Sequence, residues 1–122
     1  MKRVMIILLA VLGFCAAGFA QTIIPKPETV VMKTGKFTPN AETKIVLLAQ
    51  ADQLKSAGDL LAGYLKESLG LNLTVTRKPV ANAIVLALAT KDMGLGSEGY
   101  LLDITTGGVK ITANSECGVV YG

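Results

Sequence analysis

Apolar and polar positions change period several times along the chain, and each change predicts a new element. Residues 43–49 (TKIVLLA) and 83–89 (AIVLALA) are almost continuously apolar, which is typical of buried strands covered on both faces. Between them, over residues 51–69, charged residues occupy one face of a repeating pattern. Apolar residues recur on the other face at spacings of three and four, at Leu54, Ala57, Leu61, Tyr64, Leu65 and Leu69, with Leu60 widening this stripe. This period predicts an amphipathic helix, and Gly70 follows it where a left-handed C-cap is expected.

Near the end of the sequence the period changes to two. Residues 100–105 and 109–114 each alternate apolar with polar side chains, and Gly107-Gly108 between them suits a tight turn. A slip of one residue would expose the apolar set to water, so the pattern also fixes the register of this hairpin.

Shorter runs predict further strands. Residues 28–33 and 36–38 read as a first hairpin with a turn at Thr34-Gly35, and residues 71–76 read as a strand after the helix. The expected order is β-β-β-α-β-β-β-β, an α+β fold with a mixed β-sheet and helical cover on one face. If the strands flanking the helix are parallel, they form a right-handed βα unit.

The first 20 residues look like a leader rather than part of the fold. Two basic residues, an apolar run and a small-residue end predict a secretory signal peptide over residues 1–20, cleaved between Ala20 and Gln21. A retained membrane anchor is an alternative, and lipoprotein processing at Cys15 is disfavoured because Phe14 replaces the small residue needed there. We therefore expect export to the periplasm or beyond the cell, with membrane contact only through the signal peptide.

Residues 21–122 are enough for one domain. The leader holds two of the 12 basic residues, so the rest of the chain has ten basic and nine acidic residues. The basic residues are scattered along the sequence, whereas a nucleic-acid-binding surface needs them clustered on one face, so we expect no nucleic-acid partner. The sequence has no histidine, which excludes Cys/His and Ser/His/Asp machinery and typical zinc sites within it. Cys117, the one cysteine outside the leader, is expected to be a buried small hydrophobe.

The carboxylates offer no obvious catalytic pair. Asp103 lies on the polar side of the hairpin, where Lys110 is its expected cross-strand ion-pair partner. The stretch GLGSEG at residues 94–99 precedes a strand instead of joining a strand to a helix, so it fails the context of a dinucleotide-binding loop and is read as a plain loop. We assign no catalytic residue, no cofactor site and no metal site.

Three stretches together carry a family resemblance: IIPKPETVVMKTGKFTP at residues 23–39, LKESLGLNLTV at 65–75 and SEGYLLDITTGGVKITANSECGVVYG at 97–122. In their order and spacing they resemble the N-terminal, non-catalytic domain of bacterial β-N-acetylhexosaminidases, glycoside hydrolase family 20. The resemblance covers nearly all of the chain after the leader, residues 21–122, which we therefore expect to be one such domain.

In that family the Tyr-Gly pair matched by Tyr121 and Gly122 leads into a helix and then a (β/α)₈ barrel. The resemblance implies that residues 118–122 begin this linking helix and that the chain stops before the barrel, which needs more than about 200 residues. The family removes terminal N-acetylglucosamine or N-acetylgalactosamine from glycans through the substrate's own acetamido group. Its adjacent Asp-Glu pair lies on the barrel and has no counterpart here, so no catalytic residue is carried over.

The implied partner is the catalytic barrel of the same parent protein, and the glycan would be the substrate of the full-length enzyme. We expect the contact surface at Pro25, Pro27, Tyr121 and Gly122, although ordinary core or turn roles suit these residues equally well. The apolar tail at 119–121 is expected to lack cover, which predicts poor solubility without a partner. Two alternatives stay open: a stand-alone exported binding or scaffold domain, and the front domain of a hyaluronidase-like or α-glucuronidase-like glycosidase.

Overall fold

The computed structural model describes residues 27–122. The expected signal peptide, its cleavage site at Ala20 and Gln21, Cys15 and Pro25 lie outside the described residues. The chain divides into two compact units, Met1–Met32 and Lys33–Gly122. Within the described residues, every helix and strand belongs to the second unit: β1 (Lys44–Leu48), α1 (Lys55–Leu69), β2 (Thr74–Thr76), β3 (Ala83–Leu88), β4 (Tyr100–Thr105), β5 (Gly108–Ala113) and α2 (Glu116–Tyr121).

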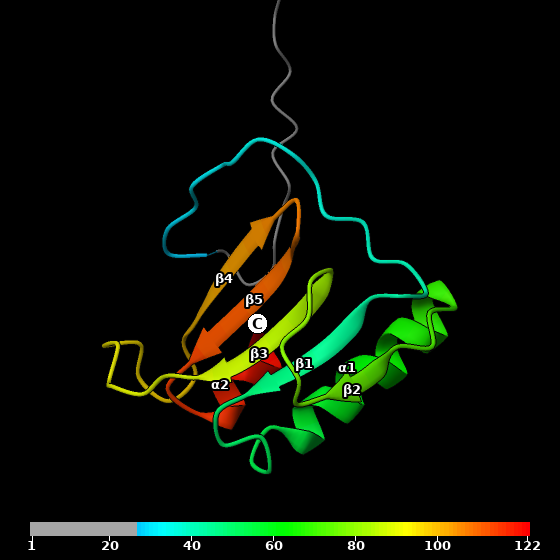
Figure 1. Ribbon diagram of the computed structural model, residues 1–122. Coiled ribbons are helices and arrows are strands. Elements are labelled where there is room, and N and C mark those ends of the chain that lie inside the picture. The colour runs from blue at the N-terminus through cyan, green and yellow to red at the C-terminus, as the bar shows by residue number, and fades with distance from the viewer. Residues whose placement is uncertain (1–26) are drawn as a thin grey trace, which may run out of the picture. The chain divides into compact units, whose positions relative to one another are not determined.

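The five strands form one mixed sheet in the order β2-β1-β3-β5-β4 (Figure 1). β2, β1, β3 and β5 run parallel to one another, and β4 pairs antiparallel with β5 as its hairpin partner. The strands on either side of α1, β1 and β2, are parallel, as the βα unit requires. The α+β class with a mixed sheet is therefore confirmed.

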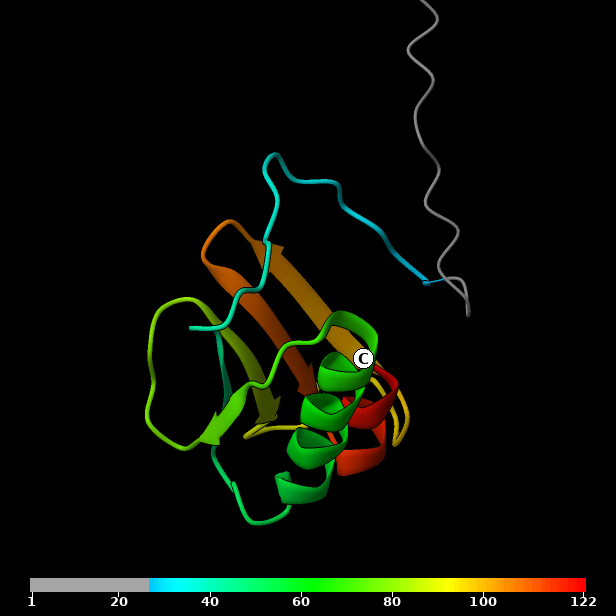
Figure 2. The ribbon, with the colours of Figure 1, turned by 90° about the vertical axis from the view of Figure 1, so that its right-hand side faces the viewer.

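Both helices lie on one side of the sheet, as Figures 1 and 2 show from two directions. The core lies between the sheet and these helices, where strand residues such as Ile45, Leu86 and Ile111 meet Leu54 of the turn before α1 and Val119 of α2. On the opposite side of the sheet, the connection between β2 and β3 crosses in front of β1 (Figures 1 and 2). The predicted helical cover on one face is thus confirmed.

α1 matches its prediction at one end and differs at the other. Gly70 adopts φ 69° and its N–H donates to the Lys66 carbonyl at 3.0 Å, which confirms the expected left-handed C-cap. The helix begins at Lys55 instead of about Ala51 because the chain reverses sharply after β1. Ala49 and Gln50 both have positive φ there, and residues 51–54 complete the turn.

The first predicted hairpin is wrong. No residue from 28 to 38 forms a strand, although the run is rich in β-branched and apolar residues. A strand needs a hydrogen-bonded partner as well as a suitable sequence, and local composition supplies only the second. The strand expected over residues 71–76 is shorter in the structure, where β2 begins at Thr74. Leu71 instead donates its N–H to the Leu65 carbonyl at 3.3 Å and completes the C-cap of α1.

The second hairpin is confirmed, with its turn shifted by one residue. Thr106 and Gly107 form the two-residue connection, and Gly108 already belongs to β5. A side chain at Gly108 would collide with the carbonyl oxygen of Ala83 on β3. Glycine is therefore needed for the close approach of two parallel strands and not for the turn itself.

A polar cluster joins the starts of β1 and β3. Thr43 is fully buried, and its Oγ1 accepts a hydrogen bond from the Asn40 N–H at 2.9 Å and donates to Asn82 Oδ1 at 3.0 Å. The Asn82 carbonyl accepts from the Lys44 N–H at 3.3 Å, and Asn82 itself has φ 53°. The cluster fixes the segment before β1 to the residue before β3.

Candidate interaction surface

α2 carries the C-terminal residues expected to form a contact surface. Ser115 caps the helix, since its Oγ accepts from the Gly118 N–H at 3.3 Å and donates to the Ser97 carbonyl. Val119 is buried in the core, whereas Val120 and Tyr121 are 47% and 61% exposed. The expectation that residues 119–121 all lack cover is therefore wrong for Val119, because successive helical residues point about 100° apart.

Two glycines let α2 approach the sheet closely. A Cβ atom at Gly118 would lie 2.5 Å from the Gly99 carbonyl oxygen and 2.7 Å from the Cβ of Ala113. At Gly122 a Cβ would lie 2.6 Å from Ile111 Cγ2 and 3.0 Å from Tyr100 Cδ2. The C-terminal end of α2 thus lies directly against β5 and the first residue of β4.

The outer side of α1 is more apolar than expected. Leu60 and Tyr64, one helical turn apart, are 62% and 66% exposed, while Ala57 and Gly58 face the sheet. The sequence pattern placed Tyr64 within the buried stripe, and that assignment is wrong. In the part of the chain that the structure describes, only the three-residue strand β2 extends the sheet beyond β1. α1 therefore covers a narrow part of the sheet, and its broad apolar stripe is partly exposed to solvent. We call Leu60, Tyr64, Val120 and Tyr121 the helix-layer surface.

The hairpin strands differ in how well they are covered. Ile111 and Ala113 of β5 are buried, as predicted. Their neighbours on the same face of β4 are less covered, and Leu102 and Ile104 are 43% and 49% exposed. α2 reaches only the Tyr100 end of β4, so the predicted apolar face is present but largely uncovered along this strand.

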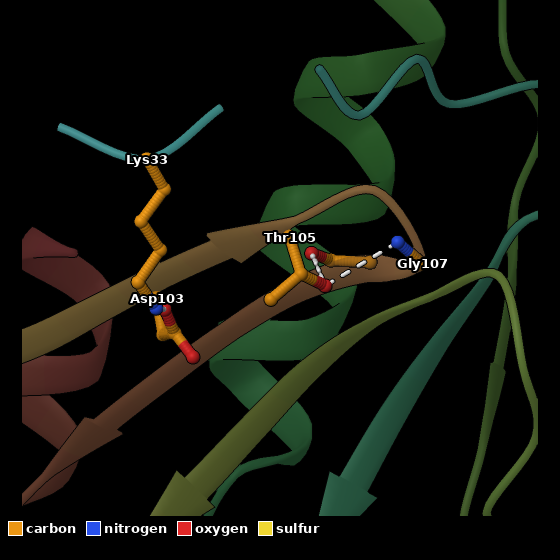
Figure 3. Close-up of polar contacts among 5 residues, drawn as sticks. Lys33, Asp103, Thr105 and Gly107 are labelled. Carbon is orange, nitrogen blue, oxygen red and sulfur yellow. Dashed lines mark hydrogen bonds and ion pairs between the residues drawn. The ribbon is translucent and has the colours of Figure 1, made fainter. Parts of the chain in front are cut away.

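On the other face of the hairpin, Asp103 has a different ion-pair partner from the one predicted. It lies directly across from Lys110 in the register, as expected, but its carboxylate pairs with Lys33 from the segment before β1 (Figure 3). Nearby, the Thr105 hydroxyl accepts from the Gly107 N–H at 3.3 Å and donates to the Gly108 carbonyl at 3.2 Å. Figure 3 thus shows a surface ion pair and two hydrogen bonds that stabilise the hairpin turn.

A shallow hollow of about 330 Å³ lies on this face, beside Asp103, Lys110, Val80 and Val85. It holds one carboxylate, already paired, so it lacks the two carboxyl groups of ordinary acid–base glycoside hydrolysis. Asp52 and Asp59 form surface ion pairs elsewhere, and within residues 27–122 no three acidic or cysteine side chains gather as metal ligands would.

The glycine-bearing loop before β4 is held by side-chain hydrogen bonds. Asp92 Oδ1 accepts from the Gly94 N–H at 2.9 Å and from Asn114 Nδ2 at 2.7 Å, while Asn114 Oδ1 accepts from the Met93 N–H at 3.1 Å. These bonds tie the loop to the end of β5 and agree with its interpretation as a plain loop.

Cys117 is exposed, so its prediction as a buried hydrophobe is wrong. It lies on α2 next to the buried residues 118 and 119, and the helical rotation turns it outward. Of the four expected contact residues, Tyr121 and Gly122 come together at the end of α2, with Tyr121 exposed and the Gly122 backbone against the sheet. Pro27 belongs to the other compact unit. No helix within residues 27–122 has the length and apolar character required to span a bilayer.

Residues 20–122 match the family model described as glycosyl hydrolase family 20, domain 2. The chain belongs to glycosyl hydrolase family 20. It corresponds to the N-terminal, non-catalytic domain, as the resemblance implied. Over 102 residues it is 32% identical to a β-hexosaminidase of Porphyromonas gingivalis, a match that covers 82% of this chain and 13% of that protein.

Two solved hexosaminidase structures share the fold. The β-N-acetylhexosaminidase of Streptomyces coelicolor A3(2) matches with a TM-score of 0.54 and 33% identity. A mutant β-hexosaminidase of Streptomyces plicatus, in complex with its product GlcNAc, matches with a TM-score of 0.53 and 33% identity. Each match covers 62% of this chain and 15% of the other, so the domain is joined to a catalytic domain in these homologues and spans a small part of their length.

Proposed function

We propose that this chain is the accessory domain of an exported β-N-acetylhexosaminidase, which it supports by packing against the catalytic barrel. The full enzyme would remove terminal N-acetylglucosamine or N-acetylgalactosamine from glycans, and the chain alone would be inactive. The observation that carries this proposal is the match of residues 20–122 to the accessory domain of the family. The relatives with this domain are hexosaminidases, which favours this role over a hyaluronidase-like or α-glucuronidase-like parent.

The helix-layer surface is our candidate for the contact with the barrel. Its four residues are large and apolar, and between 47% and 66% of each is exposed. Exposed apolar groups of this kind are common at interfaces between domains, where aromatic residues are enriched. Tyr64 and Tyr121 are the two exposed tyrosines of this layer and would be the anchors.

Export is the remaining part of the proposal. It is supported by the basic, apolar and small-residue order of residues 1–20 and by the fit of Ala20-Gln21 to a cleavage site. Mass spectrometry of the chain purified from the periplasm of an expressing bacterium would find Gln21 at its N-terminus. Material that keeps Met1 and stays in the cell would contradict export.

The activity is tested with the purified chain and the nitrophenyl β-N-acetylglucosaminide. We expect no release of nitrophenol, and turnover that persists through purification would refute the non-catalytic assignment. The supporting role is tested separately by adding the chain to an isolated catalytic domain of a family 20 enzyme and recording the melting temperature of that domain. We expect the melting temperature to rise.

The matched variants are Tyr64→Lys and Lys66→Glu, both at exposed positions of α1 but on different flanks of the helix. Tyr64→Lys should abolish the rise, because it puts a charge into the apolar contact, and Lys66→Glu should preserve it. Equal effects of the two variants would show that the barrel binds elsewhere.

A further inference from the structure

Among the strands formed by residues 27–122, none pairs with the outer edge of β4. β4 is the last strand of the sheet, and its two-residue connection to β5 makes Thr105 and Gly108 a hydrogen-bonded pair. Hydrogen-bonded and non-hydrogen-bonded pairs alternate along an antiparallel ladder. The backbone groups of Tyr100, Leu102 and Ile104 therefore point away from β5, and in residues 27–122 no other segment forms a backbone hydrogen bond with them.

This edge lacks most of the features that usually prevent strands from associating. Proteins protect exposed edges with lysine, proline or a bulge. β4 has none of these: its register with β5 is unbroken over six residues, and its single charged residue is Asp103, already paired with Lys33. Leu101, Leu102 and Ile104 are all 43–49% exposed.

We propose that β4 pairs with β4 of a second copy of this chain, antiparallel and around a two-fold axis at Leu102. Leu102 would then lie opposite Leu102 of the second copy, and Tyr100 opposite Ile104. All three outward-facing residues of each strand would form hydrogen-bonded pairs. The two five-stranded sheets would join into one continuous sheet of ten strands.

Charge and hydrogen bonding select this register over its neighbours. Moving the axis to Asp103 would bring the two carboxylates directly opposite each other in the closest type of pair, and like charges at such positions are destabilising. Moving it to Leu101 would leave Ile104 without a partner. With the axis at Leu102, Asp103 lies across from Leu101 and every outward backbone group is satisfied.

The proposed pairing also covers apolar surface. A two-fold axis perpendicular to the sheet keeps the helix sides of both copies together, so Leu102 and Ile104 of one copy adjoin Leu102 and Tyr100 of the other. Of these side chains, Leu102 and Ile104 are the ones that α2 leaves uncovered. A second copy thus fits this edge both in backbone hydrogen bonding and in side-chain chemistry.

The test compares Leu102→Lys with Leu101→Lys in the full chain, by light scattering coupled to size exclusion. The positions are adjacent and almost equally exposed, at 43% and 48%. Leu102→Lys places two lysines opposite each other and should give a monomer. Leu101→Lys places a lysine across from Asp103 of the second copy, so the dimer should persist and become more sensitive to salt. A monomeric parent, or equal loss of the dimer in both variants, would overturn the proposal.

Cross-linking checks the register independently, including the case in which Leu102→Lys fails to fold. In a background with both Cys15→Ser and Cys117→Ser, Leu102→Cys should form a disulfide with its counterpart, because hydrogen-bonded pairs have Cα atoms about 5.5 Å apart. Leu101→Cys should not, since its counterpart is displaced by two residues along the strand. A cross-link at 101 and none at 102 would overturn the register. Slow hydrogen exchange at Tyr100, Leu102 and Ile104 in a monomer would show that another segment covers the edge.

Discussion

Replacing Gly118 with alanine tests whether α2 depends on a close backbone approach to the sheet. The added methyl group would lie 2.5 Å from the Gly99 carbonyl oxygen and 2.7 Å from the Ala113 Cβ, and neither neighbour is the end of a flexible side chain. Overpacking of this kind costs about 1–3 kcal/mol. Alanine regains about 1 kcal/mol through its higher helix propensity. Because Ala113 lies in β5 and Gly99 directly precedes β4, neither can move aside, and we expect the upper end of the overpacking cost, about 2–3 kcal/mol. The net destabilisation should then be about 1–2 kcal/mol, which lowers the melting temperature of a domain of this size by about 4–16 °C.

Gly63→Ala is the matched control. Gly63 also lies in a helix, but a Cβ atom there would meet nothing within 4 Å. The same substitution should therefore stabilise the protein by about 1 kcal/mol and raise the melting temperature by about 4–8 °C. Thermal unfolding followed by far-UV circular dichroism measures both changes, and amide hydrogen exchange should show faster opening of α2 in Gly118→Ala alone. A Gly118→Ala protein that melts at or above the parent temperature would refute the close approach.

Two further predictions concern polar contacts and exposure. Thr43→Val removes the hydrogen bonds of the buried hydroxyl with Asn40 and Asn82 and should lower the free energy of unfolding in urea by about 1–3 kcal/mol. Thr74→Val, at an exposed position of β2, should change it by less than about 0.5 kcal/mol. Equal stability of the two variants would contradict the role of the polar cluster. Cys117 should react with a maleimide in the native protein, as peptide mass spectrometry would detect, and labelling at this residue only after denaturation would contradict its exposed position.

The elements predicted best are those whose signals are local. α1 ends where expected because Gly70 is the one residue there that adopts a left-handed conformation without cost, and a helix that ends so needs no distant partner. The continuous apolar runs at β1 and β3 and the alternation in β4 and β5 likewise predicted strands that the structure contains. The family resemblance was specific for the same reason, since it rested on short stretches in a fixed order.

The candidate contact surface was predicted less well. Tyr121 is exposed at the end of α2, as its expected role requires, but Val119 of the same apolar tail is buried and Tyr64, assigned to the buried stripe, is exposed. Apolar residues at spacings of three and four identify the apolar stripe of a helix, but they do not show how much of that stripe packs against the sheet. That amount depends on how much sheet lies beneath the helix, and the short β2 leaves little of it.

By itself, the sequence determined the α+β class, the amphipathic helix with its C-cap, and the period and pairing of the last hairpin. These follow from backbone preferences and from side-chain alternation within a few residues of each other. Tertiary structure alone decided the order β2-β1-β3-β5-β4, the choice of Lys33 over Lys110 by Asp103, the lack of a strand in residues 28–38 and the open edge of β4. Each of these depends on which distant segment supplies a hydrogen bond, a charge or a covering side chain. The apolar and polar pattern of one segment does not identify the segment that will pack against it.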